Sequence, residues 1–147
     1  MLANWDPIRD LVQMRQAMNR FVEDWNTRPT GRDREGTPCY RLPLDAYSTE
    51  DAIVIEAAMP GADPDEVDVT FDGDSLTIRA EVKPSEGEGR SYLIRERGYG
   101  ILERSLNLNV PVDVDKVEAQ FANGVLTLTI PKAESVKPRK IAVRAAK

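Results

Sequence analysis

The sequence contains no histidine and only one cysteine, Cys39. Without histidine the chain cannot form a Ser-His-Asp or Cys-His nucleophilic site, and it lacks the commonest zinc ligand. A single cysteine excludes an internal disulfide, and it fits a reducing compartment. Carboxylates are plentiful, so a pair of them acting as acid and base is the enzymatic alternative that stays open. Because scattered Asp and Glu are usually solvated, we expect a protein that is not an enzyme and holds no metal or cofactor.

Long apolar runs are also missing. No stretch approaches the ~20 residues of a membrane span, and the N-terminus lacks the basic region and apolar stretch of a secretory signal. The net charge of −5 argues against nucleic acid as the main partner. A length of 147 residues is enough for one domain with extensions. We therefore expect a cytoplasmic protein without stable membrane insertion and without a nucleic-acid partner.

An amphipathic helix is predicted near the N-terminus, over NWDPIRDLVQMRQAMNRFVEDW (4–25). Asp6 is the expected N-cap and Pro7 the first helical residue. Packing on the domain's own core is one possibility for this helix. Residues 26–38 argue against packing on the core, because NTRPTGRDREGTP is polar, rich in Gly and Pro, and typical of a flexible linker. Apolar residues recur at three- and four-residue steps: Ile8, Leu11, Val12, Met18, Phe21, Val22 and Trp25.

The central part of the chain, about 40–131, predicts an all-β fold. Alternating runs cover 52–58, 67–71, 75–81, 102–108, 117–121 and 125–130, with turn residues between them. Asn123-Gly124 is a strong signal for a type I′ hairpin turn. Because alternation gives each strand one apolar face, two sheets must pack as a β-sandwich. The expected inward residues are Ile53, Ile55, Val67, Val69, Phe71, Leu76, Ile78, Leu106, Leu108, Ala119, Phe121, Leu126, Leu128 and Ile130.

Arg104 breaks this pattern, since it shares the parity of Leu102, Leu106 and Leu108. A buried guanidinium is tolerated only when it is paired and hydrogen-bonded. One interpretation is a strand-end arginine whose charged end reaches water. The alternative is an ion pair at an interface, where the planar fork suits a carboxylate.

A long loop, residues 82–100, separates two of the predicted strands. Within it SYLIRE (91–96) has strand-forming character, and glycines flank it on both sides. The segment has no obvious partner in its own sheet. Pairing with the edge of another subunit would satisfy its backbone groups.

The last twelve residues, VKPRKIAVRAAK (136–147), do not resemble part of a core. From Lys132 onward there are six Lys/Arg against one Glu, so this tail carries about +5 and the rest of the chain about −10. Charge alone favours a solvated tail. Ile141 and Val143, however, point to the same side of an extended segment, so both can enter one groove.

In sequence the chain resembles the small heat-shock proteins, the α-crystallin-related chaperones, of bacterial type. WDPIRDL (5–11) and MNRF (18–21) are similar to the start of bacterial members. Three central segments match the family's domain in order and spacing: PLDAYSTEDAIVIEAAMPGADPDEVDV (43–69), RERGYGILERSLNL (95–108) and AQFANGVLTLTIPK (119–132). The segment KPRKIAV (137–143) matches the family's Ile-x-Ile/Val tail. Two departures are Asn109, where the family often has proline, and Val143, which replaces the commoner isoleucine.

The resemblance implies an immunoglobulin-like α-crystallin domain over 39–132, preceded by an arm and linker (1–38) and followed by a tail (133–147). It implies that the loop strand exchanges between two subunits, which gives the dimer-interface residues Tyr92, Leu93, Ile94, Arg95, Glu96 and Arg104. Ile141 and Val143 would dock on a neighbouring dimer, in a groove formed by Val67, Val69, Phe71, Ala119 and Phe121.

These expectations combine into a functional hypothesis. The protein is an ATP-independent holdase that binds partly unfolded clients, and heat releases its tails and exposes its arms. A β-sandwich adaptor that binds one dedicated protein as a monomer is the alternative. In the holdase, adaptable Met-bearing and aromatic surfaces suit variable clients. The expected client-binding residues are Trp5, Ile8, Leu11, Val12, Met14, Met18, Phe21, Val22 and Trp25.

Overall fold

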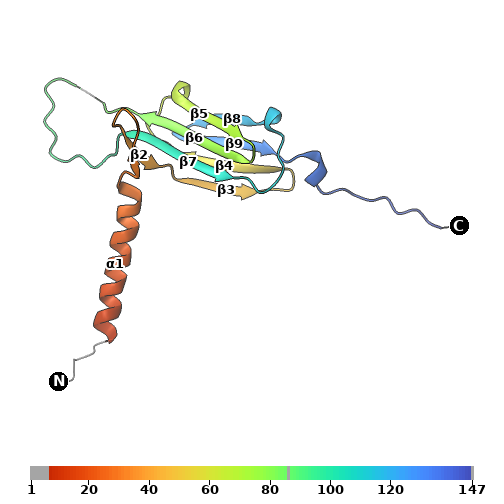
Figure 1. Ribbon diagram of the computed structural model, residues 1–147, viewed down its shortest axis with the longest axis horizontal. Coiled ribbons are helices and arrows are strands. Elements are labelled where there is room, and N and C mark those ends of the chain that lie inside the picture. Colours follow the sequence, from red (N-terminus) through yellow and green to blue (C-terminus); the bar gives the residue numbers. More distant parts are fainter. Residues whose placement is uncertain (1–6, 86, 147) are drawn as a thin grey trace.

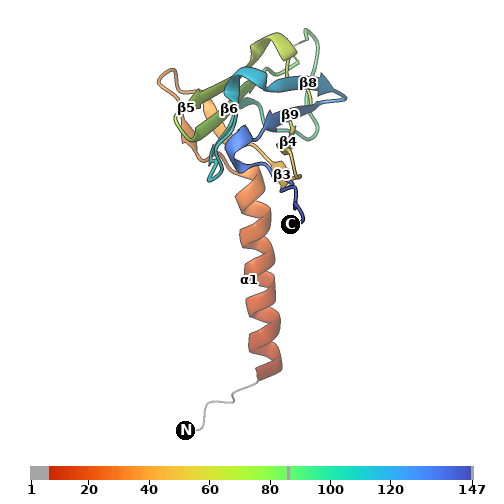
Figure 2. The same ribbon diagram turned by 90° about the vertical axis from the view of Figure 1, so that its right-hand side faces the viewer.

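Helix α1 runs from Pro7 to Thr27 and projects from a β-sandwich. The computed structural model describes residues 7–85 and 87–146, without the side chains of 20–27. Figures 1 and 2 show the helix standing away from the sandwich in two perpendicular views, and Figure 1 shows the tail leaving from the other end. Pro7 is the first helical residue among those described, and proline suits a first turn because it has the φ angle of that turn and needs no donor there. The expected cap, Asp6, lies outside the described residues.

Two sheets pack face to face, which confirms the predicted sandwich. One has the strand order β1-β2-β7-β6-β5 and the other β3-β4-β9-β8, so β5 and β8 are edge strands, as are β1 and β3. All pairs are antiparallel except β2 with β7, which is parallel. Short 3-10 helices connect strands or start the tail in the described residues: η1 (Pro64–Glu66), η2 (Val114–Lys116) and η3 (Glu134–Val136). The strands are β1 (Gly31–Arg32), β2 (Pro38–Arg41), β3 (Leu44–Ser48), β4 (Ala52–Ala58), β5 (Val67–Asp72), β6 (Ser75–Val82), β7 (Gly100–Asn107), β8 (Glu118–Ala122) and β9 (Val125–Pro131).

The β8–β9 hairpin forms at the predicted Asn-Gly turn. Asn123 has φ 53° and Gly124 has φ 75°, the two positive angles that a type I′ turn requires. Ala122 pairs with Val125 across the turn. The turn thereby fixes the register of β9, whose inward side chains are buried.

The core lies between the sheets and consists of aliphatic residues in alternating positions. Most of the predicted inward residues are buried or half-buried. The prediction for Ala119 is wrong, because the side chain of this residue is exposed. Ala119 lies on β8, an edge strand whose inward side is only partly covered. The buried core cluster comprises Leu42, Ile55, Ala57, Met59, Leu76, Ile78, Ala80, Leu108, Leu126, Leu128 and Ile130.

Residues 31–41 form a hairpin, although the sequence indicated a flexible linker over 26–38. Gly31 pairs with Cys39, and β2 then pairs with β7. The Asp33 side chain accepts hydrogen bonds from the backbone N–H groups of Glu35 (3.0 Å) and Thr37 (2.8 Å). The polar residues that suggested flexibility therefore stabilise a tight turn.

Two adjacent residues just after β2 form backbone hydrogen bonds to different sheets. The Leu42 N–H donates to the carbonyl oxygen of Glu103 (3.1 Å), and the Pro43 carbonyl accepts from the Ala58 N–H (3.1 Å). Leu42 is fully buried at this point. The chain thus passes from one sheet to the other within two residues and continues as β3.

Candidate protein-interaction surfaces

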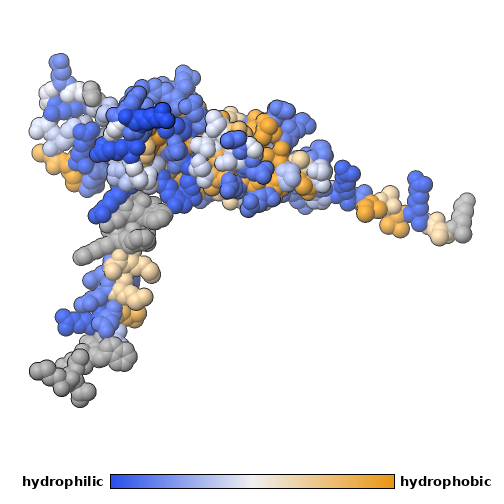
Figure 3. All heavy atoms as spheres, viewed as in Figure 1, coloured by the Kyte–Doolittle hydropathy of each residue, from blue (hydrophilic) through white to orange (hydrophobic). Residues whose placement is uncertain are grey.

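The helix has an apolar side that its own domain leaves uncovered. Leu11 (67% exposed), Met14 and Met18 are accessible, and Ile8 and Val12 are exposed beside them. Figure 3 shows apolar residues along the helix next to hydrophilic ones. Because a helix of a globular domain normally buries such a side, this surface can contact another polypeptide.

Four of the residues expected in this surface cannot be placed. Trp5 lies outside the described residues. Phe21, Val22 and Trp25 belong to α1, but they fall in the stretch whose side chains are not described. Their contact with clients stays a prediction.

The loop between β6 and β7 holds its apolar residues in solvent. Leu93 is fully exposed and Ile94 is 73% exposed. The residues from 87 to 99 form no strand within this single chain. The expected strand 91–96 therefore has no partner among the described residues, and its backbone groups remain available for one.

Cation–π contacts and hydrogen bonds shape this loop. The Arg95 guanidinium lies 4.9 Å from the ring centre of Tyr92 and 5.1 Å from that of Tyr99. The Ser85 carbonyl oxygen accepts hydrogen bonds from Arg90 Nη1 (2.8 Å) and the Tyr92 hydroxyl (3.4 Å). These contacts are solvent-exposed, so they hold the loop only weakly.

The two ends of the loop are attached to the sandwich. At one end Lys83 Nζ lies 2.6 Å from Glu66 Oε1, and this hydrogen bond raises the pKa of Lys83 above its ordinary value. At the other end the Tyr40 ring packs on Gly98, where a Cβ atom would lie 3.2 Å from the ring. Gly100 follows with φ 140°, and a Cβ there would collide with the Pro38 carbonyl. Both ends of the loop thus contact the sandwich.

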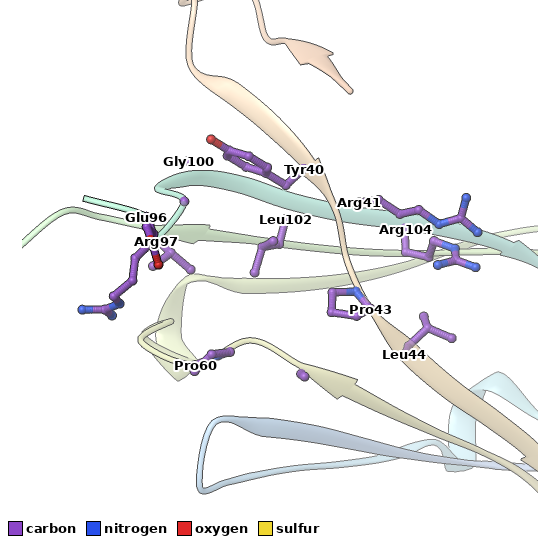
Figure 4. Close-up of a pocket in the computed structure, with 13 residues that line it drawn as sticks. Tyr40, Arg41, Pro43, Leu44, Pro60, Glu96, Arg97, Gly100, Leu102 and Arg104 are labelled. Atoms are coloured by element: carbon purple, nitrogen blue, oxygen red, sulfur yellow. The ribbon is translucent and has the colours of Figure 1, made fainter. Parts of the chain in front are cut away.

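A cavity of about 620 Å³ opens where this loop meets β2 and β3. Figure 4 shows Leu102 and Pro60 at its apolar part, with Glu96 and Arg97 at one end and Arg104 near the other. The structure thus brings two expected interface residues, Glu96 and Arg104, to the same cavity. The remaining loop residues 92–95 do not line it. Sequence reasoning missed this cavity, because β2 and β3 were not recognised as strands.

Arg104 is half-buried on β7 and faces the gap between the sheets. Its Nη1 donates to the carbonyl oxygen of Leu42 at 3.3 Å. Partial burial lowers the pKa of Arg104, and the nearby charge of Arg41 lowers that pKa further. Arg104 forms no ion pair within the described part of the chain, so a carboxylate partner would have to come from elsewhere.

The β5–β8 edge, as we name the open side of the sandwich between these two edge strands, is partly apolar. Val67, Val69 and Phe71 on β5 and Phe121 on β8 are half-buried and pack against the core. Ala119 on β8 lies exposed at this edge. The five residues expected to form a docking groove thus lie on the two edge strands.

The tail extends away from its own β5–β8 edge, as Figure 1 shows. The Lys132 N–H donates to the Asp51 carbonyl (2.8 Å), which fixes the start of the tail. Beyond η3, Ile141 is 84% and Val143 is 93% exposed. Ile141 and Val143 therefore do not meet the expected groove within one chain.

The part of the chain that the structure describes shows neither a metal-ligand cluster nor a membrane-spanning helix. Within residues 7–85 and 87–146 no group of three His, Cys, Asp or Glu side chains is arranged to hold a metal ion. No helix in these ranges is long and apolar enough to cross a membrane. The features that stand out are the exposed apolar side chains of α1, the loop and the tail.

The chain is similar to known proteins in sequence and in structure. Residues 45–144 match the Hsp20/alpha crystallin family. The 18 kDa antigen 2 of Mycobacterium avium is 36% identical over 90% of this chain and 93% of its own. Heat shock protein 16.0 from Schizosaccharomyces pombe has a similar structure, with a TM-score of 0.60 and 31% identity over 71% of this chain and 98% of its own.

A second solved structure is a small heat-shock protein from Xylella fastidiosa, described as having a distinct high order structure. It has a TM-score of 0.57 and 30% identity, over 71% of this chain and 96% of its own. Both structures share at least 30% identity with the chain, so the likeness extends beyond the fold to the sequence.

Proposed function

The chain belongs to the Hsp20/alpha crystallin family as a bacterial-type small heat-shock protein, and from this premise we propose that it is an ATP-independent holdase. Members of this family are chaperones, and the chain has their α-crystallin domain. In our proposal it binds partly unfolded proteins without acting on them as an enzyme. It works in the cytoplasm, which the single cysteine favours.

The uncovered side of α1 is the observation that carries this proposal. Leu11, Met14 and Met18 are exposed on a helix that stands away from a folded domain. Unbranched, polarizable methionine side chains adapt to irregular apolar surfaces. Such a surface suits clients that share exposed apolar residues and no common sequence.

A dimer formed by strand exchange would use the loop between β6 and β7. Strand β3 has a partner, β4, on one side only among the described strands. In our proposal Tyr92 to Glu96 of a second copy adds to this edge, where main-chain hydrogen bonds supply the affinity. Arg104, which borders the cavity beside β3, then lies at the dimer interface.

Larger assemblies would form through the tails. Burying Ile141 and Val143 contributes ~1.5–3 kcal/mol for each side chain before the ordering of the tail is counted. One docked tail is therefore weak, but several tails in one assembly act together. The high order structure of the Xylella fastidiosa relative supports such an assembly. In our proposal heating releases tails, allows subunits to exchange and exposes the arms and the vacated edges.

The test is suppression of light scattering by a heat-denatured client at a near-stoichiometric ratio. The unmodified protein should suppress aggregation without ATP. A Met14→Ser/Met18→Ser variant should protect several-fold less, because it loses apolar contact area. A Gln13→Ser/Gln16→Ser variant changes the same exposed helix outside its apolar side and should protect fully. Failure of the unmodified protein to protect would end the holdase proposal.

Native mass distinguishes the alternative of a monomeric adaptor. An adaptor should have the mass of one chain, 16.4 kDa. A holdase of the proposed kind should appear as dimers or larger particles.

A further inference from the structure

Acidic residues are concentrated around the β5–β8 edge. Residues 63–74 and 113–122, which form the two edge strands and their approaches, contain nine Asp or Glu and a single Lys. The tail from residue 132 onward has the opposite balance, six Lys or Arg against one Glu. The two segments with these opposite charges are the two that the proposed assembly brings together.

The acidic side chains border the apolar part of this edge. Along β5, half-buried and exposed residues alternate, so that Asp68 and Asp72 are exposed beside Val69 and Phe71. On β8, Glu118 is exposed at the start of the strand. We call Asp68, Asp72 and Glu118 the acidic rim.

No ion pair among the described residues neutralises the rim carboxylates. Asp68, Asp72 and Glu118 form no ion pair with any residue in the described ranges. Arg79, which lies opposite Asp68 in the register of β5 and β6, instead contacts Glu103 (3.0 Å) and Asp33 (3.9 Å). The rim therefore retains its negative charge toward an incoming segment.

The alternation of the tail matches that of the edge. In an extended tail Ile141 and Val143 point to one side, and Lys140 and Arg144 point to the other. If the aliphatic pair faces the apolar residues of the edge, the two basic side chains project outward. Their long flexible stems allow the charged ends to reach carboxylates at the rim.

We infer that the acidic rim makes the β5–β8 edge selective for a basic tail from a second copy of this chain. This inference rests on the tail docking in the proposed function and adds a charge requirement to it. The aliphatic pair supplies contact area, and the rim selects segments whose flanking residues are Lys or Arg. Neutral or acidic segments with the same apolar pair are disfavoured, because they leave the carboxylates unpaired or repelled.

Peptide binding tests the inference on the full-length protein. The receptor is an Ile141→Ser/Val143→Ser variant, whose own tails no longer compete. The probe is a fluorescent peptide of residues 136–146, followed by anisotropy. Its comparison peptide carries Lys140→Ser and Arg144→Ser, and a third carries Ile141→Ser and Val143→Ser.

A rim variant of the receptor carries Asp68→Asn, Asp72→Asn and Glu118→Gln. Its matched control removes the same amount of charge from exposed positions near β3 and β4, with Asp45→Asn, Glu50→Gln and Glu56→Gln. All six positions are exposed, so both receptors should keep their fold. Thermal unfolding of each receptor verifies this.

The rim variant should bind the basic peptide about tenfold more weakly, as expected for several exposed ion pairs acting together. The control receptor should lose less than about twofold, because its charges lie farther from the site. Raising NaCl from about 50 to about 500 mM should weaken binding to the unmodified rim by a similar factor, since exposed pairs are screened. The Lys140→Ser/Arg144→Ser peptide should bind more weakly and respond less to either change, because it keeps only Lys137 and Arg139 of its four basic residues.

Two results would overturn the inference in different ways. Binding of the basic peptide that depends on Ile141 and Val143 but not on salt or the rim would overturn the charge requirement and leave tail docking intact. Absence of binding by every peptide would overturn tail docking itself and the inference with it. In both cases the light-scattering assay tests the holdase activity separately.

Discussion

Arg104 Nη1 lies 3.3 Å from the carbonyl oxygen of Leu42, to which it donates a hydrogen bond. The bond connects β7 with the point where the chain passes between the sheets. An Arg104→Ala variant should lose about 1 kcal/mol in the free energy of unfolding, because the carbonyl loses a donor. The dimer should dissociate more readily as well. Urea denaturation and native mass spectrometry measure the two effects.

Arg79→Ala is the control for this variant. Arg79 contacts Glu103 at 3.0 Å, but both side chains are more than two-fifths exposed. Exposed pairs contribute only ~0–1 kcal/mol, so stability and dimer content should change little. Equal effects of both substitutions would contradict the role that we assign to Arg104.

Gly100 holds the start of β7 close to β2. Its φ of 140° disfavours other residues, and a Cβ atom would collide with the Pro38 carbonyl. Gly100→Ala should therefore cost more than about 2 kcal/mol in the free energy of unfolding. Gly31→Ala is the matched control, since a Cβ at Gly31 meets no atom within 4 Å. Thermal unfolding of the two variants checks the prediction, which similar melting temperatures would refute.

Ile94 lies in the segment expected to exchange between subunits. Ile94→Pro removes the backbone donor of this residue, so an added strand at β3 would lose a hydrogen bond. The population should shift from dimers to monomers while the sandwich stays folded, because Ile94 is exposed in the single chain. Sedimentation velocity measures the shift. Glu88→Pro lies in a turn of the same loop and should leave the dimer unchanged; an unaffected Ile94→Pro dimer would exclude exchange through this segment.

Ile141 and Val143 are the apolar residues that the tail exposes most. An Ile141→Ser/Val143→Ser variant should form smaller particles with an intact domain, since each side chain contributes ~1.5–3 kcal/mol of burial at a docking site. Size-exclusion chromatography with light scattering, run cold and warm, gives the particle mass. An Ala145→Ser/Ala146→Ser variant is the control, because it adds two hydroxyl groups to the tail without removing Ile141 or Val143. Its particles should keep the size of the unmodified protein. Unchanged particles in the first variant would mean that the tail is only solvated.

Strands with strong alternation could be predicted from the sequence almost to the residue. The run 52–58 is β4 and 125–130 is β9 without its last residue. Both are central strands whose inward residues are buried, so the local pattern reports the burial directly. The hairpin at Asn123 follows equally directly, because its turn chemistry is contained in two residues.

Features that depend on distant contacts could not be predicted. Strand β2 exists because Cys39 and Tyr40 pair in parallel with Ile101 and Leu102, and such a short stretch has no alternation to reveal this. The cavity near Arg104 depends on the same pairing. Exposure of Ala119 follows from the position of β8 at a sheet edge, which the pattern of β8 itself does not contain. The fold class was thus accessible, whereas the surroundings of the candidate interface were not.

Residues 38–48 belong to both layers of the sandwich, since Leu42 bonds to one and Pro43 to the other. Because this segment is hydrogen-bonded to both sheets, separating it from one sheet also strains its bonds to the other. In the proposed assembly, a captured client that pulls on α1 would load the β1–β2 hairpin first and then β3, the proposed exchange edge. In the proposed assembly, a force on α1 would therefore reach the proposed dimer edge through residues that are hydrogen-bonded to both sheets.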